Sequence, residues 1–194
     1  MRESGILMHI TSLPAPYGIG TMGKDAYAFV DFLVRAGQRY WQILPLTPTG
    51  YGDSPYQSLG ACAGNHYLID LDRLADEGLL KKEEIQNIPW GSNPVRVDFG
   101  AMYAHRMNVL RQAFQRFTPD GAYETFVEQN RNWLEDYALF TALKDTLGGK
   151  PWLDWPEALR LRKADALTEK RRELSDEIRL QYFVQYEFDR QWKA

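Results

Sequence analysis

Residues 39–57 read RYWQILPLTPTGYGDSPYQ, and this stretch decides how the rest of the chain is interpreted. It begins with an apolar run, residues 40–46, which is too short to span a membrane and too apolar for a surface loop. We therefore expect a buried strand, and burial on both faces is typical of a parallel sheet. Residues 47–55 are dense in turn-forming residues and predict an irregular loop that leaves the carboxyl end of this strand.

This loop carries side chains suited to a neutral, polyhydroxylated ligand. Loops at the carboxyl ends of parallel strands hold the chemistry of such folds. The candidate binding residues are Tyr51, Asp53, Ser54, Tyr56 and Gln57. Aromatic faces cover the C–H faces of a sugar ring, while amides, hydroxyls and carboxylates form hydrogen bonds with its rim. The pattern therefore favours a carbohydrate site.

The composition is that of a folded protein. The chain has 194 residues, which is enough for one domain with a sizeable core, and 44% of them are hydrophobic. Aromatic residues make up 13%, an excess that serves either the core or a stacking surface.

Several classes of partner and site are excluded by charge and residue type. The net charge is −3 with both signs mixed along the chain, so we expect no nucleic-acid partner. The single cysteine, Cys62, excludes an internal disulfide and a cysteine-based zinc cluster, and we expect it to be a small buried residue. His9, His66 and His105 lack metal-ligand spacing, so neither a metal nor another cofactor is expected. His9 is either a hydrogen-bonded core residue or a ligand or general base.

Membrane association is not expected either. No apolar stretch approaches about 18 residues, and the first five residues lack the apolar segment of a signal peptide. The sequence therefore predicts a soluble, cytoplasmic protein.

The chain begins with the pattern of a strand, a helix and a strand. Residues 5–10 predict a first strand, and Asp25 is a candidate N-cap for the helix that follows. Gly37 is expected to end this helix, whose apolar stripe consists of Ala26, Phe29, Val30, Leu33 and Val34. This arrangement is a βαβ unit.

The remainder of the chain predicts mainly helices. We expect a short helix over residues 72–78 and a connector over residues 81–99. A longer helix has the expected stripe Tyr103, Met107, Leu110, Phe114 and Phe117. Another carries Phe126, Val127, Trp133, Leu134, Tyr137, Phe140 and Leu143. A solvated stretch over residues 160–173 and a last helix that ends at Trp192 follow. Two parallel strands cannot form an independent sheet, so we expect further strands after residue 194.

Several motifs together resemble one known family. They are residues 5–9 with 11–14, residues 16–20, residues 38–57, residues 64–65 with 67–69, and residues 133–140. The sequence resembles the amino-terminal part of the 4-α-glucanotransferases of the amylomaltase, or disproportionating-enzyme, family. The resemblance covers nearly the whole chain, and GYGDSPYQ at residues 50–57 is its most specific motif. Ile10, where the family often has proline, is a small departure.

The resemblance implies an α/β fold, namely the first two strands of a (β/α)8 TIM barrel with an inserted, mainly helical subdomain. The expected boundaries are residues 1–58 for the start of the barrel, 59–170 for the insertion and 171–194 for a helix that returns to the barrel. The implied activity is transfer of α-1,4-glucan segments between maltodextrin, starch or glycogen chains, without a cofactor, by a retaining double displacement. The remainder of the barrel is then the expected partner of these residues.

The resemblance also implies roles for the loop. The catalytic carboxylates of the family are expected beyond residue 194, so none of the residues in this chain is predicted to be catalytic. Tyr56 is expected to stack on a donor-side sugar and Ser54 to form a hydrogen bond with it, with Tyr51 and Gln57 at the border of the groove. Alternatively, Tyr56 packs the loop onto the barrel. Asp53 either binds sugar or braces the loop through nearby backbone amides.

Further alternatives stay open at this point. Tyr103 is either an additional glucan contact or a core residue. The chain as a whole is either a segment of a transferase or a noncatalytic α-glucan-binding or structural fragment, and hydrolysis in place of transfer is a third possibility.

Overall fold

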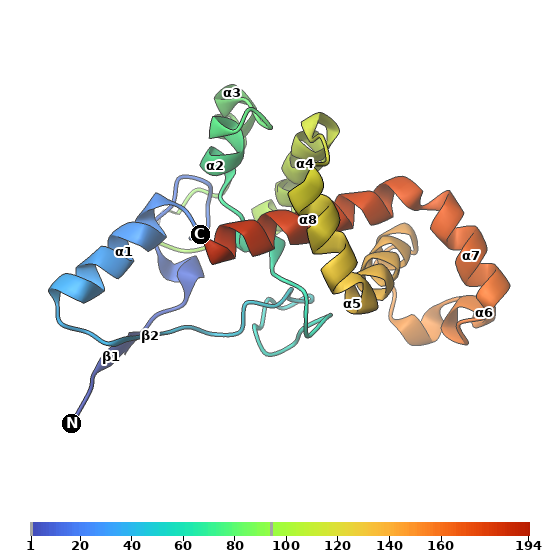
Figure 1. Cartoon of the computed structure of the whole chain (residues 1–194), viewed down its shortest axis with the longest axis horizontal. Helices are drawn as coiled ribbons and strands as arrows, with labels where there is room; N and C mark the ends of the chain where they lie inside the picture. The colour runs from blue at the N-terminus through green and yellow to red at the C-terminus, as the bar shows by residue number, and fades with distance from the viewer. Residues whose placement is uncertain (1, 94) are drawn as a thin grey trace. The chain divides into compact units, whose positions relative to one another are not determined.

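The computed structural model of the chain describes residues 2–93 and 95–194 (Figure 1). It divides into two compact units. Unit 1 consists of Met1–Thr118 together with Glu187–Ala194, and unit 2 consists of Pro119–Tyr186.

Unit 1 begins with the predicted βαβ arrangement. Strands β1 (Gly5–Leu7) and β2 (Tyr40–Gln42) are parallel, with Ile6 opposite Trp41. Helix α1 (Lys24–Arg35) connects them (Figure 1). Both strands have only three residues and are shorter than the sequence predicted. The prediction of a buried second strand is wrong for this chain, because each strand has a single neighbour and Tyr40 remains 60% exposed.

Helix α1 contacts the sheet with only part of its apolar stripe. Leu33 is buried, and the ring of Phe29 lies 5.0 Å from that of Trp41, whereas Val30 and Val34 are exposed. The N-cap is Gly23 instead of the predicted Asp25, which lies in the first turn and interacts favourably with the helix dipole there. Gly37 ends the helix as predicted, with φ +68°.

The core next to the sheet includes residues that the first loop supplies. The 3-10 helix η1 (Ile10–Ser12) follows β1 and buries Ile10. Its buried cluster consists of Ile10, Leu13, Met22 and Leu68. The expectation of a buried Cys62 is wrong, because this residue is exposed. The Nδ1 atom of His9 is buried without a hydrogen-bond partner among the described residues.

Four short or medium helices follow the loop after β2. They are η2 (His66–Leu68), α2 (Leu71–Asp76), α3 (Lys82–Gln86) and α4 (Phe99–Arg116). The expectation of a connector over residues 81–99 is wrong at α3, where the Glu84 carboxylate accepts from the Lys81 N–H at 2.9 Å and so begins the helix. The face of α4 is rotated relative to the predicted stripe. Its buried residues are Met102, Arg106, Val109, Leu110 and Ala113.

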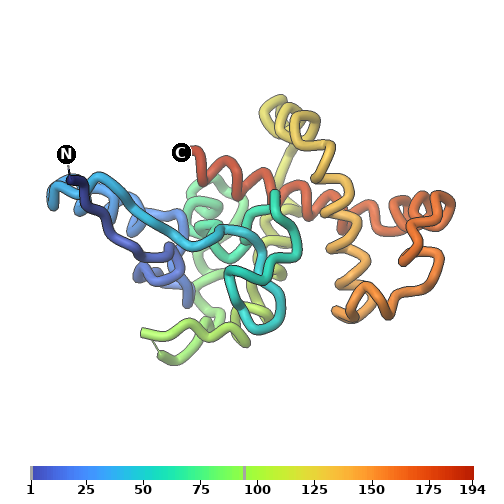
Figure 2. The backbone as a smooth tube through the Cα atoms, turned by 90° about the horizontal axis from the view of Figure 1, so that it is seen from below, coloured from blue at the N-terminus to red at the C-terminus, as the bar shows by residue number. Residues whose placement is uncertain are grey.

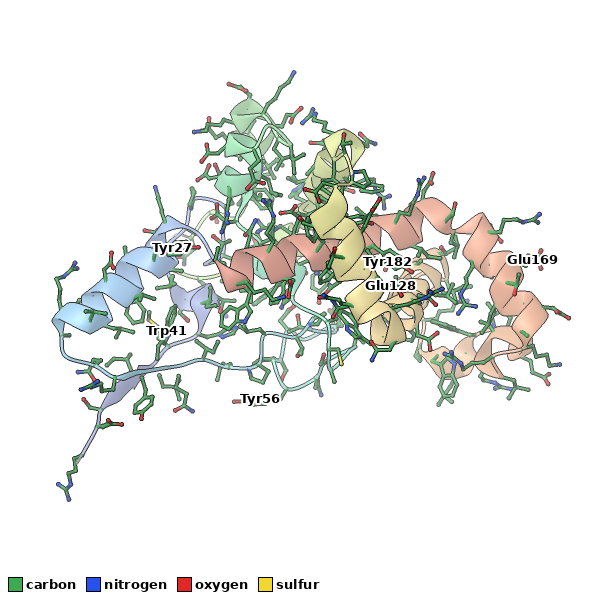
Figure 3. The ribbon with its side chains drawn as sticks, viewed as in Figure 1. Tyr27, Trp41, Tyr56, Glu128, Glu169 and Tyr182 are labelled. Atoms are coloured by element: carbon green, nitrogen blue, oxygen red, sulfur yellow. The ribbon has the colours of Figure 1, made fainter. Side chains whose placement is uncertain are left out.

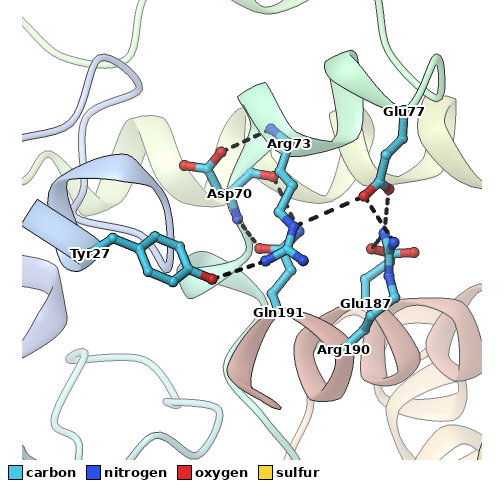
Figure 4. Close-up of polar contacts among 7 residues, drawn as sticks. All are labelled: Tyr27, Asp70, Arg73, Glu77, Glu187, Arg190 and Gln191. Carbon is cyan, nitrogen blue, oxygen red and sulfur yellow. Dashed lines mark hydrogen bonds and ion pairs between the residues drawn. The ribbon is translucent and has the colours of Figure 1, made fainter. Parts of the chain in front are cut away.

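The last residues of the chain belong to unit 1 through contacts with α2. The Asp70 backbone N–H donates to Gln191 Oε1 at 2.6 Å, and Gln191 Nε2 donates to the Asp70 carbonyl at 3.3 Å (Figure 4). Arg190 pairs with Glu77 and, at 2.7 Å, with Glu187. These contacts hold the end of helix α8 (Ser175–Lys193) beside α2, as the close-up shows.

Unit 2 is helical. It contains α5 (Gly121–Thr146), η3 (Trp152–Asp154), α6 (Glu157–Arg160), α7 (Ala164–Glu173) and most of α8. Its core includes Leu139, Ala142, Leu143, Trp155, Leu159, Leu167 and Leu174. Helix α7 buries Leu167 and otherwise faces solvent, which confirms the predicted solvated stretch.

Candidate functional site

Residues 47–59 leave the sheet after β2 and fold back on themselves (Figure 2). An isolated antiparallel bridge joins Thr49 to Ser58. Beside it, the Gly50 N–H donates to the Gln57 carbonyl at 3.3 Å, and the Leu59 N–H donates to the Pro48 carbonyl at 3.3 Å. The loop is therefore closed at its base and projects its tip as a separate feature.

Two tight turns form the tip. In the first, the Asp53 N–H donates to the Gly50 carbonyl at 3.1 Å, and Gly52 at the third position has φ +102°. A type II turn needs a positive φ at that position, which glycine adopts without strain. In the second, the Gln57 N–H donates to the Ser54 carbonyl at 3.1 Å, with Pro55 between them. The turn-forming residues that marked this loop in the sequence therefore make its two turns.

The loop is tied to helix α4 by one side chain. The Tyr103 hydroxyl lies 2.9 Å from the Gly50 carbonyl oxygen and 3.1 Å from Asp53 Oδ1. Burial and the nearby Asp53 carboxylate raise the pKa of Tyr103 to about 12, so the phenol keeps the hydrogen that it donates. Asp53 thus braces the loop through Tyr103. The expected bonds to nearby backbone amides are not what the structure records for this carboxylate.

The expectation of a core position for Tyr103 is wrong, whereas its role as a glucan contact stays a prediction. It is 48% exposed, so it is not a core residue. Its ring lies edge-on to the buried ring of Tyr67, at 6.2 Å between centroids. One side of Tyr103 therefore rests on the core while its hydroxyl holds the loop.

The two tyrosines of the loop are open to solvent. Tyr51 is 98% exposed and Tyr56 is 74% exposed, and the Tyr56 side chain extends away from the ribbon in Figure 3. Ser54 lies at the second turn, where its Oγ accepts from the Tyr56 N–H at 3.4 Å. Gln57 is exposed on the same turn. The backbone is therefore constrained while both aromatic faces remain free to cover a ligand.

Below the loop, a buried platform holds its return segment. The Asn65 N–H donates to the Leu46 carbonyl at 2.7 Å, and the Asn65 side chain accepts from the Tyr67 N–H at 3.0 Å. Arg106 of α4 donates to the Tyr67 carbonyl at 2.9 Å and to that of Ile69. The backbone at both ends of the loop is thus bonded to the interior of unit 1.

Burial controls the charges of this platform. Arg106 is fully buried, and desolvation lowers its pKa to about 10. Burial, with the Arg106 cation as a second cause, lowers the pKa of His66 to about 3, so this imidazole is neutral at pH 7. Sequence reasoning missed Arg106, because a charged residue was not counted as part of an apolar stripe. Its spacing of four from Met102 and three from Val109 was the available signal.

Residues 47–59 lack the pair of carboxylates that retaining glycosyl transfer needs. Asp53 is the single carboxylate in residues 47–59. Retaining transfer of a glycosyl group needs two carboxyls about 5–5.5 Å apart. Among residues 2–93 and 95–194, no group of three or more His, Cys, Asp or Glu side chains could hold a metal ion. None of the described helices is long and apolar enough to cross a membrane.

Comparison with known proteins identifies the relatives of this chain. A family model described as 4-alpha-glucanotransferase matches residues 8–194. The 4-alpha-glucanotransferase of Streptococcus pneumoniae TIGR4 is 47% identical over 195 residues, a match that covers 98% of this chain and 39% of the relative. That of Thermus thermophilus is 49% identical over 199 residues and is matched over 39% of its length. The chain therefore spans about 39% of the length of these curated relatives.

Solved structures agree with the sequence matches. The amylomaltase from Streptococcus agalactiae, solved in complex with acarbose, has a TM-score of 0.95 and is 45% identical, and the match covers all of this chain and 40% of that one. The amylomaltase from Corynebacterium glutamicum has a TM-score of 0.70 at 17% identity and supports the fold alone. These matches confirm the predicted α/β fold class, the amino-terminal part of a (β/α)8 barrel with a mainly helical addition.

Proposed function

This chain belongs to the 4-alpha-glucanotransferase family, and we propose that it supplies the glucan-binding loop of an enzyme that transfers α-1,4-glucan segments. The donor and acceptor chains are maltodextrin, starch or glycogen, and the chemistry is a retaining double displacement. In this proposal, two carboxylates outside residues 1–194 act as nucleophile and as acid and base. No cofactor takes part.

One observation supports the proposed binding role of the loop. Its backbone is held by hydrogen bonds, while its aromatic side chains are exposed. Tyr56 is 74% exposed although the backbone around it is held by two turns and by Tyr103. Because the backbone that carries Tyr56 is already ordered, binding of a sugar ring costs little additional backbone entropy. The S. agalactiae relative, 45% identical over the whole of this chain, was solved with acarbose bound, which supports a carbohydrate as the ligand.

Each loop residue has a role in this proposal. Tyr56 stacks on a donor-side sugar ring, and Ser54 forms a hydrogen bond with its rim. Tyr51 and Gln57 border the groove. Asp53 keeps the loop in shape through Tyr103, and its second oxygen is available to a sugar hydroxyl.

The division of the chain is part of the same proposal. Residues 1–58 start the barrel and carry the loop, residues 59–170 are the helical insertion, and residues 171–194 return to the barrel. The rest of that barrel is the proposed partner. The exposed thiol of Cys62 suits a reducing compartment, so we propose the cytoplasm as the location.

A protein that binds α-glucan without transferring it is the second candidate, favoured by the single carboxylate of the loop. Glucose release from maltotriose by the chain together with the rest of its barrel separates the two candidates. A transferase or hydrolase gives this product, and a binding protein does not.

Replacement of Tyr56 tests the binding role. Stacking on a sugar is worth about 1 kcal/mol, so Tyr56→Ala should weaken maltoheptaose binding at least about 5-fold in calorimetric titrations. Tyr56→Phe keeps the aromatic face and should lose about 3-fold or less. Tyr27→Ala, which removes an exposed tyrosine of α1, is the matched control. If Tyr56→Ala lowers the melting temperature yet binds normally per folded molecule, Tyr56 packs the loop and the proposal is wrong.

A further inference from the structure

Unit 2 has a hollow of its own, with a volume of about 220 Å³. It lies among residues of α5, η3, α6 and α7. Its apolar surface includes Phe140, Trp152, Trp155 and Leu159, and its polar residues are Asp136 and Arg162. Known pockets for drug-sized ligands are about 300–1,000 Å³. The hollow is therefore of a size to hold one ring of a ligand.

The apolar floor of the hollow is rigid. The rings of Phe140 and Trp155 are stacked, with centroids 5.3 Å apart. The Trp155 indole N–H donates to the Lys150 carbonyl at 3.1 Å. Both rings are therefore held by the protein itself.

Trp152 differs from Trp155 although both line the same hollow. It is 47% exposed, and its side chain makes no hydrogen bond or ring contact with the described residues. Because Trp152 is 47% exposed, part of its indole surface is open to solvent, and its indole N–H has no hydrogen-bond partner among the described residues. Trp152 is thus a free stacking surface at the edge of a fixed floor.

The polar side of the hollow is made of paired charges. Arg162 Nη2 lies 2.8 Å from Asp136 Oδ2, and Arg171 Nη2 lies 3.5 Å from Asp136 Oδ1. Exposed pairs of this kind contribute about 0–1 kcal/mol to stability. Asp136, Arg162 and Arg171 together carry a net charge of +1, and their donor and acceptor atoms can form hydrogen bonds with a ligand that carries hydroxyl groups. Guanidinium donates to a hydroxyl oxygen and carboxylate accepts from a hydroxyl hydrogen.

The backbone of Arg162 is unusual at this position. Four helix ends share one hydrogen-bond pattern, in which the residue after a left-handed residue donates to a carbonyl five positions earlier. The left-handed residues at three of these ends are Gly37, Gly78 and Gly148. At the end of α6 the Lys163 N–H donates to the Ala158 carbonyl at 2.9 Å, and the left-handed residue is Arg162 with φ +52°. Glycine is the usual residue at this place, so the chain keeps a charged side chain beside the hollow at a conformational cost.

We propose that this hollow is a second binding site for an α-1,4-glucan, which takes one glucosyl ring against Trp152. The indole covers a C–H face of the sugar, and the pair formed by Arg162 and Asp136 binds hydroxyl groups at its rim. The identity of the ligand rests on the proposed function of the family, whereas the site consists of residues that the loop does not contain. A polymer with many equivalent rings is the natural ligand of two such sites.

The test uses the full chain with the Tyr56→Ala substitution, which removes the stacking residue of the loop. Maltoheptaose is titrated while the indole N–H signals are followed by NMR, each assigned by replacement of one tryptophan. The Trp152 signal should shift with saturation, and the signal of Trp192, which is 50% exposed on α8, should not. Trp152→Ala should then weaken the remaining binding at least about 5-fold, and Trp192→Ala should change it less than about 2-fold. Trp152→Phe should restore part of the affinity, and unchanged melting curves show that the variants fold.

The outcomes separate this inference from the proposed function. If Tyr56→Ala abolishes all binding and the Trp152 signal never moves, the hollow is not a glucan site and the loop proposal stands. If the Trp152 signal moves while Tyr56→Ala changes nothing, the hollow binds glucan and the loop proposal fails. If maltoheptaose neither moves the Trp152 signal nor binds the unsubstituted chain, both are overturned.

Discussion

Asp53 and Arg162 have nearly the same backbone conformation in two very different settings. They are the two non-glycine residues with positive φ in the described part of the chain, at +57° and +52°. Asp53 lies in an exposed loop, and the contact that its carboxylate makes is with Tyr103, 50 residues away. Arg162 ends a helix, where two backbone hydrogen bonds on either side of it already require the left-handed conformation.

The difference shows that a non-glycine residue with positive φ can be stabilised in two ways. The loop combines its own backbone hydrogen bonds with a side chain from α4, so it also responds to changes far along the chain. The end of α6 keeps its shape through local backbone bonds, so the Arg162 side chain is free to serve the hollow. Predictions on both regions follow from this difference.

Acid should weaken unit 1 and spare unit 2. Residues 119–186 contain no histidine, whereas His66 lies in the platform below the loop and has its pKa lowered to about 3. The unfolded chain takes up a proton as the pH falls below about 6.5, and the folded chain does not, so stability falls from pH 6.5 towards pH 3. The loss is at most about 1.4 kcal/mol per pH unit. Hydrogen exchange, corrected for its intrinsic pH dependence, should show a loss of amide protection at low pH in α2 and no such loss in α5.

His66→Gln is the control for this prediction. It should remove most of the pH dependence in unit 1, and the part that remains is assigned to His9, whose pKa burial also lowers. Equal loss of protection in both units would contradict the assignment to histidine.

Tyr103→Phe should loosen the loop while the rest of unit 1 stays folded. The substitution removes the hydroxyl that reaches Gly50 and Asp53, a loss of about 1 kcal/mol. The exchange rates of the Asp53 and Gln57 amides should rise about 5-fold, with little change in melting temperature. Tyr51→Phe is a matched control, because the Tyr51 side chain is 98% exposed. Unchanged amide exchange would mean that the two turns hold the loop by themselves.

Arg162→Gly should change stability least of these substitutions, and it should raise the free energy of unfolding where the others lower it. Glycine relieves the left-handed backbone by up to about 1 kcal/mol, and the lost ion pair with Asp136 offsets part of that gain. Chemical denaturation should therefore show a slightly more stable protein. Asp53→Gly relieves the same backbone conformation but also removes the acceptor of Tyr103, so the loop should exchange faster without a gain. A destabilised Arg162→Gly protein would show that the side chain supports the fold of unit 2.

Local patterns predicted the positions of most helices and of the βαβ unit. Gly37 and Gly78 end helices where the sequence placed helix ends. Burial was predicted less well. The second strand was expected to be covered on both faces, but coverage depends on neighbouring strands and cannot be read from the strand itself.

The error on α4 has a specific cause. The predicted stripe contained Tyr103 and Met107, whereas the buried face contains Arg106. An apolar count ignores a guanidinium, but this one is satisfied in part by backbone carbonyls from residues 67 and 69. The pairing itself joins residues far apart in the sequence, so the spacing of Arg106 from Met102 and Val109 was the one local signal of its burial.

For the candidate site, the sequence predicted the position of the loop but not the contact that ties it to α4. Turn-forming residues located the loop, because turns depend on neighbours in the sequence. The bond between Tyr103 and Asp53 joins residues 50 positions apart and needed the structure. The hollow of unit 2 was missed entirely, because its arginine was assigned to a solvated stretch and its tryptophans to no site.

The contact between Asp70 and Gln191 also sets an order of events during synthesis of the protein. The two residues are 121 positions apart, which at about 5–20 residues per second corresponds to roughly 10 s on the ribosome. During that interval the Asp70 N–H has no Gln191 to bond, and Glu77 has no Arg190. All of unit 2 is made before the residues that complete unit 1. The amino-terminal unit, although its first residues are translated before unit 2, therefore gains these contacts only after unit 2 has been made.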